Sequence, residues 1–127
     1  MSSHPAPRPV RLTLHRRSRV LEVAFDDDQV YRLDAEYLRV FSPSAEVRGH
    51  GRGQEILQVG KENVAITEVE PVGHYAVRLH FDDGHNTGLY SWRLLRELGE
   101  QYAQKWGDYL RRLDNVGYER KPRQDGE

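Results

Sequence analysis

The sequence predicts an α+β domain in which antiparallel hairpins come first and helices follow. Up to residue 90, apolar and polar residues alternate in short runs separated by turn residues, the pattern of strands that bury one face. From residue 91 onward, apolar residues recur at intervals of three and four, as on an amphipathic helix. We therefore expect one curved or two separate antiparallel hairpin-rich sheets, a short helix after each half, and a C-terminal amphipathic helix over one face.

The length of 127 residues fits a single domain. Residues 1–8 are rich in proline, and we expect them to form a flexible lead-in. Residues 9–116 carry the periodic pattern and form the expected domain. Residues 117–127 are mostly charged and lack an apolar period, so we expect a flexible charged tail there.

The first half contains three expected strands and one expected helix. Alternation predicts strands at 10–14, 21–25 and 30–33. Asp34 is a suitable N-cap for a short helix. Pro43 ends this helix, because proline disfavours helical backbone in the residue before it.

The stretch after this helix is rich in glycine. Residues 45–61 are expected to form a loop, with one helical turn around 54–59. Alternation then predicts a strand at 64–67, and Pro71-Val72-Gly73 is typical of a turn.

The last strands and the helices have clearer signals. Residues 75–81 alternate again, and Asp83-Gly84 predicts a two-residue hairpin turn that pairs residues 86–90 with them. Ser91 is a good N-cap for the following helix, and Gly99 is expected to break or kink it. The apolar face of the next helix consists of Tyr102, Trp106, Tyr109, Leu110 and Leu113.

One pattern occurs twice. The segment Leu21-x-Val23-x-Phe25-Asp26-Asp27 recurs 56 residues later as Val77-x-Leu79-x-Phe81-Asp82-Asp83, and Leu33 and Leu38 recur as Leu89 and Leu94. A duplicated hairpin–helix unit would explain this. Chance similarity is the alternative, because Phe-Asp-Asp is common at hairpin ends.

Composition excludes several kinds of site. The chain has no cysteine, which excludes disulfides, thiolate zinc sites and cysteine-ligated iron–sulfur clusters. Its net charge of -1 gives no general attraction to nucleic acid or anionic lipid, so we expect neither as a partner. No apolar run approaches the roughly 18 residues of a membrane helix, and no apolar segment typical of a secretory signal is present, so we expect a cytoplasmic protein.

Histidine and aspartate gather near the expected hairpin turn. His80, Asp82 and His85 are close in sequence, and imidazole and carboxylate ligands suit iron or zinc. His50 is a candidate for a further ligand. The alternative is a solvated turn in which the aspartates form local hydrogen bonds. No serine has a convincing His/Asp arrangement for nucleophilic catalysis, so the motifs favour a non-enzymatic protein and leave a metal-dependent enzyme as the alternative.

Two blocks resemble a known family. The block Leu38-Arg39-Val40-Phe41-Ser42-Pro43-Ser44-Ala45-Glu46-Val47-Arg48-Gly49-His50 and the block Asp83-Gly84-His85-Asn86-Thr87-Gly88-Leu89-Tyr90-Ser91-Trp92 are similar to the gamma-butyrobetaine hydroxylase-like N-terminal domain family. The resemblance covers roughly residues 9–114. In the hydroxylases this domain precedes a separate iron- and 2-oxoglutarate-dependent catalytic domain. A chain of 127 residues does not hold both, so the hydroxylase reaction is not expected here.

The resemblance also implies a zinc site that has been lost. In the hydroxylases the domain binds structural zinc through Cys-x-Cys-x-x-Cys and a later histidine. The cysteine positions fall here on Ser42, Ser44 and Val47, and His85 matches the histidine. The resemblance therefore implies a domain that keeps the fold without the zinc, and no cofactor is expected.

Two functions stay open after this reasoning, and RNA binding through Arg16, Arg17 and Arg19 is a third and least favoured one. The first is a non-catalytic binding or adaptor module that docks a protein partner or forms a homodimer. Its candidate binding residues are Ser42, Ser44, Arg48, His50, His85, Tyr90 and Trp92. The second is a small metal-binding protein or metal-dependent enzyme that holds iron or zinc on His80, Asp82, His85 and His50. Similar domains fused to ATPases that carry iron–sulfur clusters suggest a role accessory to metal-centre biogenesis.

Overall fold

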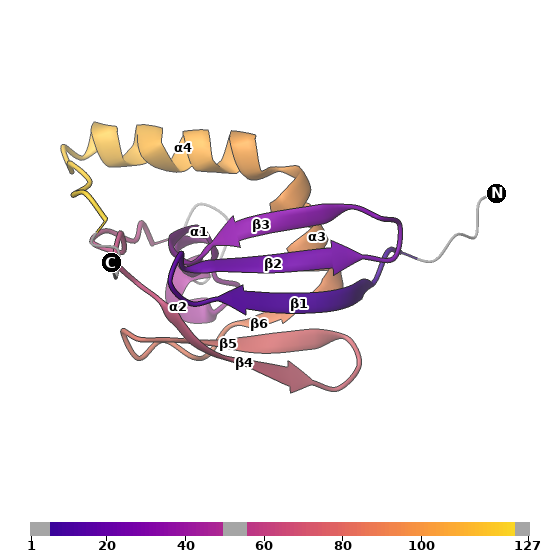
Figure 1. Ribbon diagram of the computed structural model, residues 1–127. Helices are drawn as coiled ribbons and strands as arrows, with labels where there is room; N and C mark the ends of the chain where they lie inside the picture. The colour runs from indigo at the N-terminus through magenta and orange to yellow at the C-terminus, as the bar shows by residue number, and fades with distance from the viewer. Residues whose placement is uncertain (1–5, 50–55, 124–127) are drawn as a thin grey trace.

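Alternating apolar residues build two three-stranded antiparallel sheets, which lie one above the other in Figure 1. The computed structural model describes residues 6–49 and 56–123. The first sheet has the order β1-β2-β3 and the second β4-β5-β6. The strands are β1 (Pro9–His15), β2 (Val20–Phe25), β3 (Val30–Asp34), β4 (Ile66–Val72), β5 (Ala76–Phe81) and β6 (Leu89–Ser91). The predicted α+β class is confirmed, with two sheets rather than one.

Each sheet is followed directly by a helix. The helices are α1 (Ala35–Val40), α2 (Ala45–Arg48), α3 (Trp92–Glu100) and α4 (Tyr102–Asn115). The predicted N-cap Ser91 is confirmed, because its Oγ accepts a hydrogen bond from the Leu94 amide at 3.0 Å. The Asp34 side chain makes no cap hydrogen bond, although α1 begins directly after it.

The core lies between the apolar faces of both sheets and the helices α1 and α3. Its fully buried members include Leu21, Leu33, Tyr37, Leu38, Leu79, Tyr90 and Leu95. The helix α4 closes the core through aromatic rings: Tyr102 packs edge-on against Tyr37 at 4.8 Å between ring centroids. The Tyr37 hydroxyl also donates to the Leu98 carbonyl at 2.6 Å, which ties α1 to α3.

The two sheets with their helices form an internal repeat. β2 and β5 match at an offset of 56 residues, and β1 and β4 match at 57, with a register shift at the same place in both first strands. The turns after the central strands repeat as well. The Phe25 amide donates to the Gln29 carbonyl at 2.8 Å, and the Phe81 amide donates to the His85 carbonyl at 3.0 Å. The duplication hypothesis therefore describes the fold.

The offset changes to 57 after the second turn, which contains one residue more. Leu33 therefore corresponds to Tyr90 and not to Leu89. Leu33 and Tyr90 are both buried, whereas Leu89 is 39% exposed. The sequence comparison missed this shift because a constant offset also places a leucine at that position.

Several predicted boundaries were wrong. Asp83-Gly84 does not close a two-residue hairpin, because β6 starts at Leu89 and a longer loop joins it to β5. Pro71 and Val72 belong to β4 and not to a turn. A short helix, α2, forms where only a loop was expected. Of the helical turn expected at 54–59, residues 54 and 55 lie outside the described residues, and residues 56–59 are not helical.

Gly99 lies inside α3 and does not break it. A Cβ at this position would come within 2.5 Å of the Tyr31 ring, so glycine is needed for close packing of α3 against β3. The helix ends one residue later at Glu100, with Gln101 as its C-cap.

The start of the predicted flexible tail packs against the domain. Arg120 forms an ion pair with the buried Glu36, and the Tyr118 hydroxyl donates to Glu62 at 2.7 Å. Gly117 has φ of 75°, which turns the chain back after α4. Among the described residues, no helix is both long and apolar enough to cross a membrane.

Candidate functional site

A buried histidine joins the segment after α1 to the loop after β5. His85 Nε2 lies 2.9 Å from Ser42 Oγ, and its Nδ1 lies 3.1 Å from Glu46 Oε1. Burial and the nearby Arg39 charge lower the pKa of His85 more than Glu46 raises it, so the imidazole is neutral at pH 7. A carboxylate only accepts, so Nδ1 donates to Glu46 and Nε2 accepts from the Ser42 hydroxyl.

Ser44 makes a second connection between the same two segments. Its Oγ caps α2 by accepting from the Glu46 amide at 3.1 Å. The same hydroxyl shares a 2.6 Å hydrogen bond with Thr87 Oγ1. We call Ser42, Ser44, Glu46, His85 and Thr87 the polar cross-link.

A charged group supports the polar cross-link from the turn after β5. Asp83 binds Lys61 Nζ at 2.6 Å and Arg39 Nε at 2.9 Å, and it accepts from the His85 amide. Burial by itself would raise the pKa of Asp83, but the hydrogen bonds from Lys61, His85 and Arg39 outweigh it and lower the pKa to about 2. Asp83 is therefore ionised, and it fixes the turn that carries His85.

The line Ser42–His85–Glu46 has the order of groups found in serine hydrolases, which the sequence reasoning missed. However, Ser42 is only 1% exposed, and its Oγ also accepts from the Ser44 amide. A Cβ on Gly88 would come within 2.5 Å of that oxygen, so the loop backbone covers it. Because the Ser42 hydroxyl is buried and already hydrogen-bonded to His85 and the Ser44 amide, we assign this line a structural role.

The residues present do not fit the zinc that the family resemblance implies. Zinc sites of this kind use thiolate sulfur. Ser42 and Ser44 offer hydroxyls that are already hydrogen-bonded, and Val47 offers no ligand atom. The structure nevertheless brings Ser42 and His85 together, so a hydrogen bond joins two positions that a metal would join in the hydroxylases.

The other predicted metal ligands do not meet. His80 lies on β5 and binds Glu70 Oε1 at 2.8 Å. Asp82 accepts from the Ala65 amide at 3.1 Å, whereas His85 belongs to the polar cross-link. His50 lies outside the described residues.

Two residues predicted to form a docking edge are engaged inside the domain. Tyr90 is fully buried, and its hydroxyl donates to the Leu38 carbonyl at 2.5 Å, so it offers no surface to a partner. Trp92 is partly buried, and its indole N–H donates to the His74 carbonyl. Both were selected from the sequence as candidate binding residues, but these aromatic residues instead fasten β6 and α3 to their neighbours.

A cavity of about 260 Å³ lies beside the polar cross-link. Its apolar wall is formed by Val40, Phe41, Pro43, Val47, Ile56, Leu94 and Leu98, and Ser42 borders it. Arg48, Lys105 and Arg112 also line it, together with Glu97. The sequence reasoning selected Arg48 but missed Lys105 and Arg112, because nothing local shows that α4 brings them to α2.

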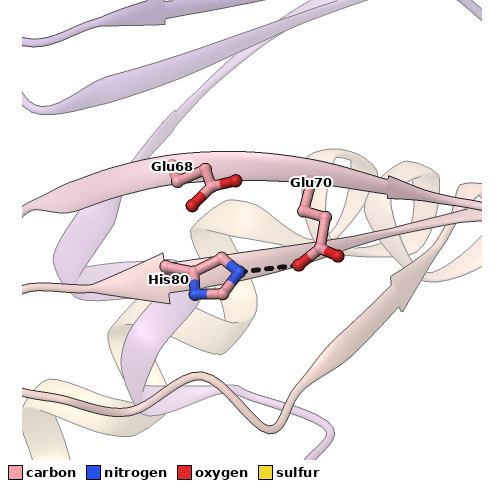
Figure 2. A group of neighbouring side chains, drawn as sticks. All are labelled: Glu68, Glu70 and His80. Carbon is pink, nitrogen blue, oxygen red and sulfur yellow. Dashed lines mark hydrogen bonds and ion pairs between the residues drawn. The ribbon is translucent and has the colours of Figure 1, made fainter.

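His80 has different neighbours from those predicted. On the outer face of the second sheet, ligand atoms of Glu68, Glu70 and His80 all lie within 4.8 Å of one another. Figure 2 shows the imidazole beside both carboxylates, with its hydrogen bond to Glu70. Among the described residues this is the one group of at least three such side chains.

The fold and the polar cross-link define a repeated sheet–helix domain whose Ser42–His85 contact lies where the family resemblance expects a metal site. Residues 12–96 match the family model for gamma-butyrobetaine hydroxylase-like, N-terminal domains. The chain belongs to this family, as the resemblance of the two sequence blocks predicted.

Solved structures show the same fold. Two NMR solution structures are each 46% identical to this chain: one has a TM-score of 0.79 over 95% of this chain and 96% of that chain, and the other has 0.80 over 98% and 93%. A crystal structure from Acidithiobacillus ferrooxidans ATCC 23270, of a protein with unknown function in the DUF971 family, is 46% identical, with a TM-score of 0.62 over 72% of this chain and 92% of that chain. No curated protein matches the chain.

Proposed function

We propose that this chain is a non-catalytic binding module that docks an acidic peptide segment of a protein partner in the cavity beside α1, α2, α3 and α4. The observation that carries this proposal is the combination of an apolar wall with three cationic side chains around one cavity. A cytoplasmic location and the absence of nucleic-acid binding belong to the same proposal.

Charge favours an acidic partner. Arg48, Lys105 and Arg112 line the cavity against one acidic residue, Glu97. Within residues 6–49 and 56–123, none of the three cations forms an ion pair, whereas seven other arginines there do: Arg11, Arg32, Arg39, Arg96, Arg111, Arg120 and Arg123. Lys105 lies 5.5 Å from the centroid of the Phe41 ring, above the apolar wall. Carboxylates of a partner would therefore meet cations without displacing existing ion pairs.

The size of the cavity favours a side chain of a peptide over a separate small molecule. Small-molecule sites usually measure about 300–1,000 Å³, and this cavity is smaller, at about 260 Å³. An apolar side chain flanked by acidic residues matches both its wall and its charges. The polar cross-link holds Ser42 and Val47 in place, so one side of the cavity is pre-formed.

Fluorescence anisotropy with two labelled peptides tests the proposal. The first peptide is Glu-Asp-Leu-Phe-Glu-Asp, and the second has lysine in place of each acidic residue. We expect the acidic peptide to bind and the lysine peptide not to bind. In the double variant Arg48→Glu/Arg112→Glu, affinity for the acidic peptide should fall by at least about tenfold, equivalent to about 1.4 kcal/mol.

The double variant Arg93→Glu/Arg111→Glu is the matched control, because both arginines are exposed on α3 and α4 and neither lines the cavity. It makes the same change in net charge and should bind the acidic peptide like the unchanged protein. Equal loss in both double variants, or equal binding of both peptides, would contradict the proposal. If the acidic peptide does not bind, and the protein instead self-associates in a way that Arg48→Glu/Arg112→Glu abolishes, the peptide proposal is wrong. The cavity would then be the interface of a homodimer.

A further inference from the structure

We propose that Glu68, Glu70 and His80 form a binding site for a divalent transition-metal ion on the outer face of the second sheet. This site is separate from the cavity and from the polar cross-link. It shares only His80 with the ligands expected from the sequence.

Strand geometry brings the three side chains together. Glu68 and Glu70 are two residues apart on β4, so they point to the same face. His80 lies opposite Glu68 on β5 in the antiparallel register. A hairpin therefore supplies one imidazole and two carboxylates, which suit zinc and other ions that accept nitrogen and oxygen ligands.

The first repeat shows that folding does not require these residues. The positions equivalent to Glu68, Glu70 and His80 hold Arg11, Thr13 and Ala24. The first sheet thus forms the same ladder with none of the three ligand side chains. Their presence in the second sheet alone needs a different explanation, which a ligand supplies.

The outer faces of the two sheets also differ in charge, and the second sheet has more carboxylates and fewer cations around the equivalent positions. On the first sheet, the Glu22 carboxylate is surrounded by Arg11, His15 and Arg32. On the second sheet, Glu70 binds His80, and Arg78 lies opposite it in the register. Glu68 is exposed and forms no ion pair within the part of the chain that the structure describes.

The ionised carboxylate of Glu70 suits the binding of a cation. The hydrogen bond from His80 lowers the pKa of Glu70, and the Arg78 charge lowers it further, so Glu70 is ionised at neutral pH. Glu68 and Glu70 carry two negative charges against the single positive charge of Arg78. A metal ion binds neutral imidazole and ionised carboxylates, so protons compete with it for these ligands and affinity should fall as the solution becomes acidic.

Isothermal titration of the untagged full chain with zinc chloride tests this site. We expect one zinc ion per chain and weaker binding at pH 5.5 than at pH 7.5. Loss of a group that hydrogen-bonds to a metal ligand typically weakens metal binding by about 10–100-fold, so His80→Ala, which removes a direct ligand, should weaken it by more than tenfold. Glu68→Gln should also weaken it, and it keeps the size of the side chain.

His15→Ala is the matched control, because His15 forms the same kind of contact with Glu22 at 2.9 Å but has arginines around it in place of a second carboxylate. It should leave zinc affinity unchanged. In NMR spectra, cobalt(II) should broaden amide signals of β4 and β5 around Glu68 and His80. Absence of zinc binding at about 1 mM, or binding that persists in His80→Ala, would overturn the proposal.

Discussion

The two repeats share a backbone but carry different side chains at the turn after the central strand. In the first repeat, Gln29 is exposed and Asp27 binds Arg96 of α3 at the surface. In the second, His85 is buried and Asp83 binds Arg39 of α1. Arg39 and Arg96 occupy equivalent positions, so each helix holds the turn of the other repeat.

The difference between the two turns separates the contacts that the hairpin needs to fold from contacts that are present in the second turn alone. The first turn shows what the hairpin needs, which is local hydrogen bonding by aspartate and one arginine from the opposite helix. The second turn adds a buried histidine, a lysine and the connection to Ser42. These additions hold Ser42, which borders the cavity, so the second turn supports one wall of the proposed binding site on a scaffold common to both repeats.

Removing the two equivalent arginines should give the largest difference between the repeats. Arg39→Met leaves the partly exposed Asp83 carboxylate with Lys61 as its remaining cation, and loss of this partly buried ion pair should cost about 2 kcal/mol. Arg96→Met breaks a more exposed pair and should cost about 1 kcal/mol. Urea denaturation at pH 7 measures both free energies of unfolding. Equal losses would show that the two turns are equivalent.

Acid should distinguish the two aspartates. The folded pKa of Asp83 is about 2, below the ordinary value of 3.8, so its stabilisation is present above pH 4 and is lost as the pH falls toward 2. Asp83→Asn should reduce the free energy of unfolding at pH 7 by about 1 kcal/mol, because solvent screens part of the interaction of this partly exposed carboxylate, and it should flatten the loss of stability between pH 4 and pH 2.

The matched variant is Asp27→Asn, whose carboxylate is more exposed and also has its pKa lowered by Arg96. Its effect at pH 7 should be smaller than that of Asp83→Asn. A larger effect for Asp27→Asn would contradict the conclusion that the less exposed Asp83 makes the stronger interactions.

Exchanging the last residue of each turn should have the smallest effect. His85→Gln makes the second turn like the first and should cost about 1 kcal/mol through loss of a buried hydrogen bond. Gln29→His, at an exposed position, should change stability by less than about 0.5 kcal/mol.

His85→Gln should also change how the stability of the protein depends on pH. The pKa of His85 is lowered in the folded protein, so the unfolded chain takes up a proton first when the pH falls below about 6.5. The unchanged protein should therefore lose stability between pH 7 and pH 5, and His85→Gln should lose less over the same interval. Thermal unfolding at both pH values measures this difference.

Sequence reasoning reached the fold because strand alternation and helix caps act locally. The strand β2 and the Ser91 cap follow from neighbouring residues. The extra residue of the second turn was missed because it changes no local pattern and shows only in the pairing of β6 with β5.

The candidate site was harder to predict from the sequence, because its residues come together only through contacts between distant segments. Ser42 and His85 were paired through the family resemblance, since 43 residues separate them and no periodicity connects them. The grouping of His80 with Glu68 and Glu70 depends on the register between β4 and β5, which a bulge shifts. Lys105 and Arg112 reach the cavity only because α4 packs back on α1.

Methyl NMR spectra recorded during titration with the acidic peptide Glu-Asp-Leu-Phe-Glu-Asp test most directly whether the cavity is the binding site. Val47, Leu94 and Leu98 line the cavity, and Leu12 and Leu14 lie on the first sheet. We predict that the methyl signals of the first group shift with peptide concentration while those of the second group stay unchanged. Shifts confined to Leu12 and Leu14, or no shifts in either group, would contradict the binding function assigned to the cavity.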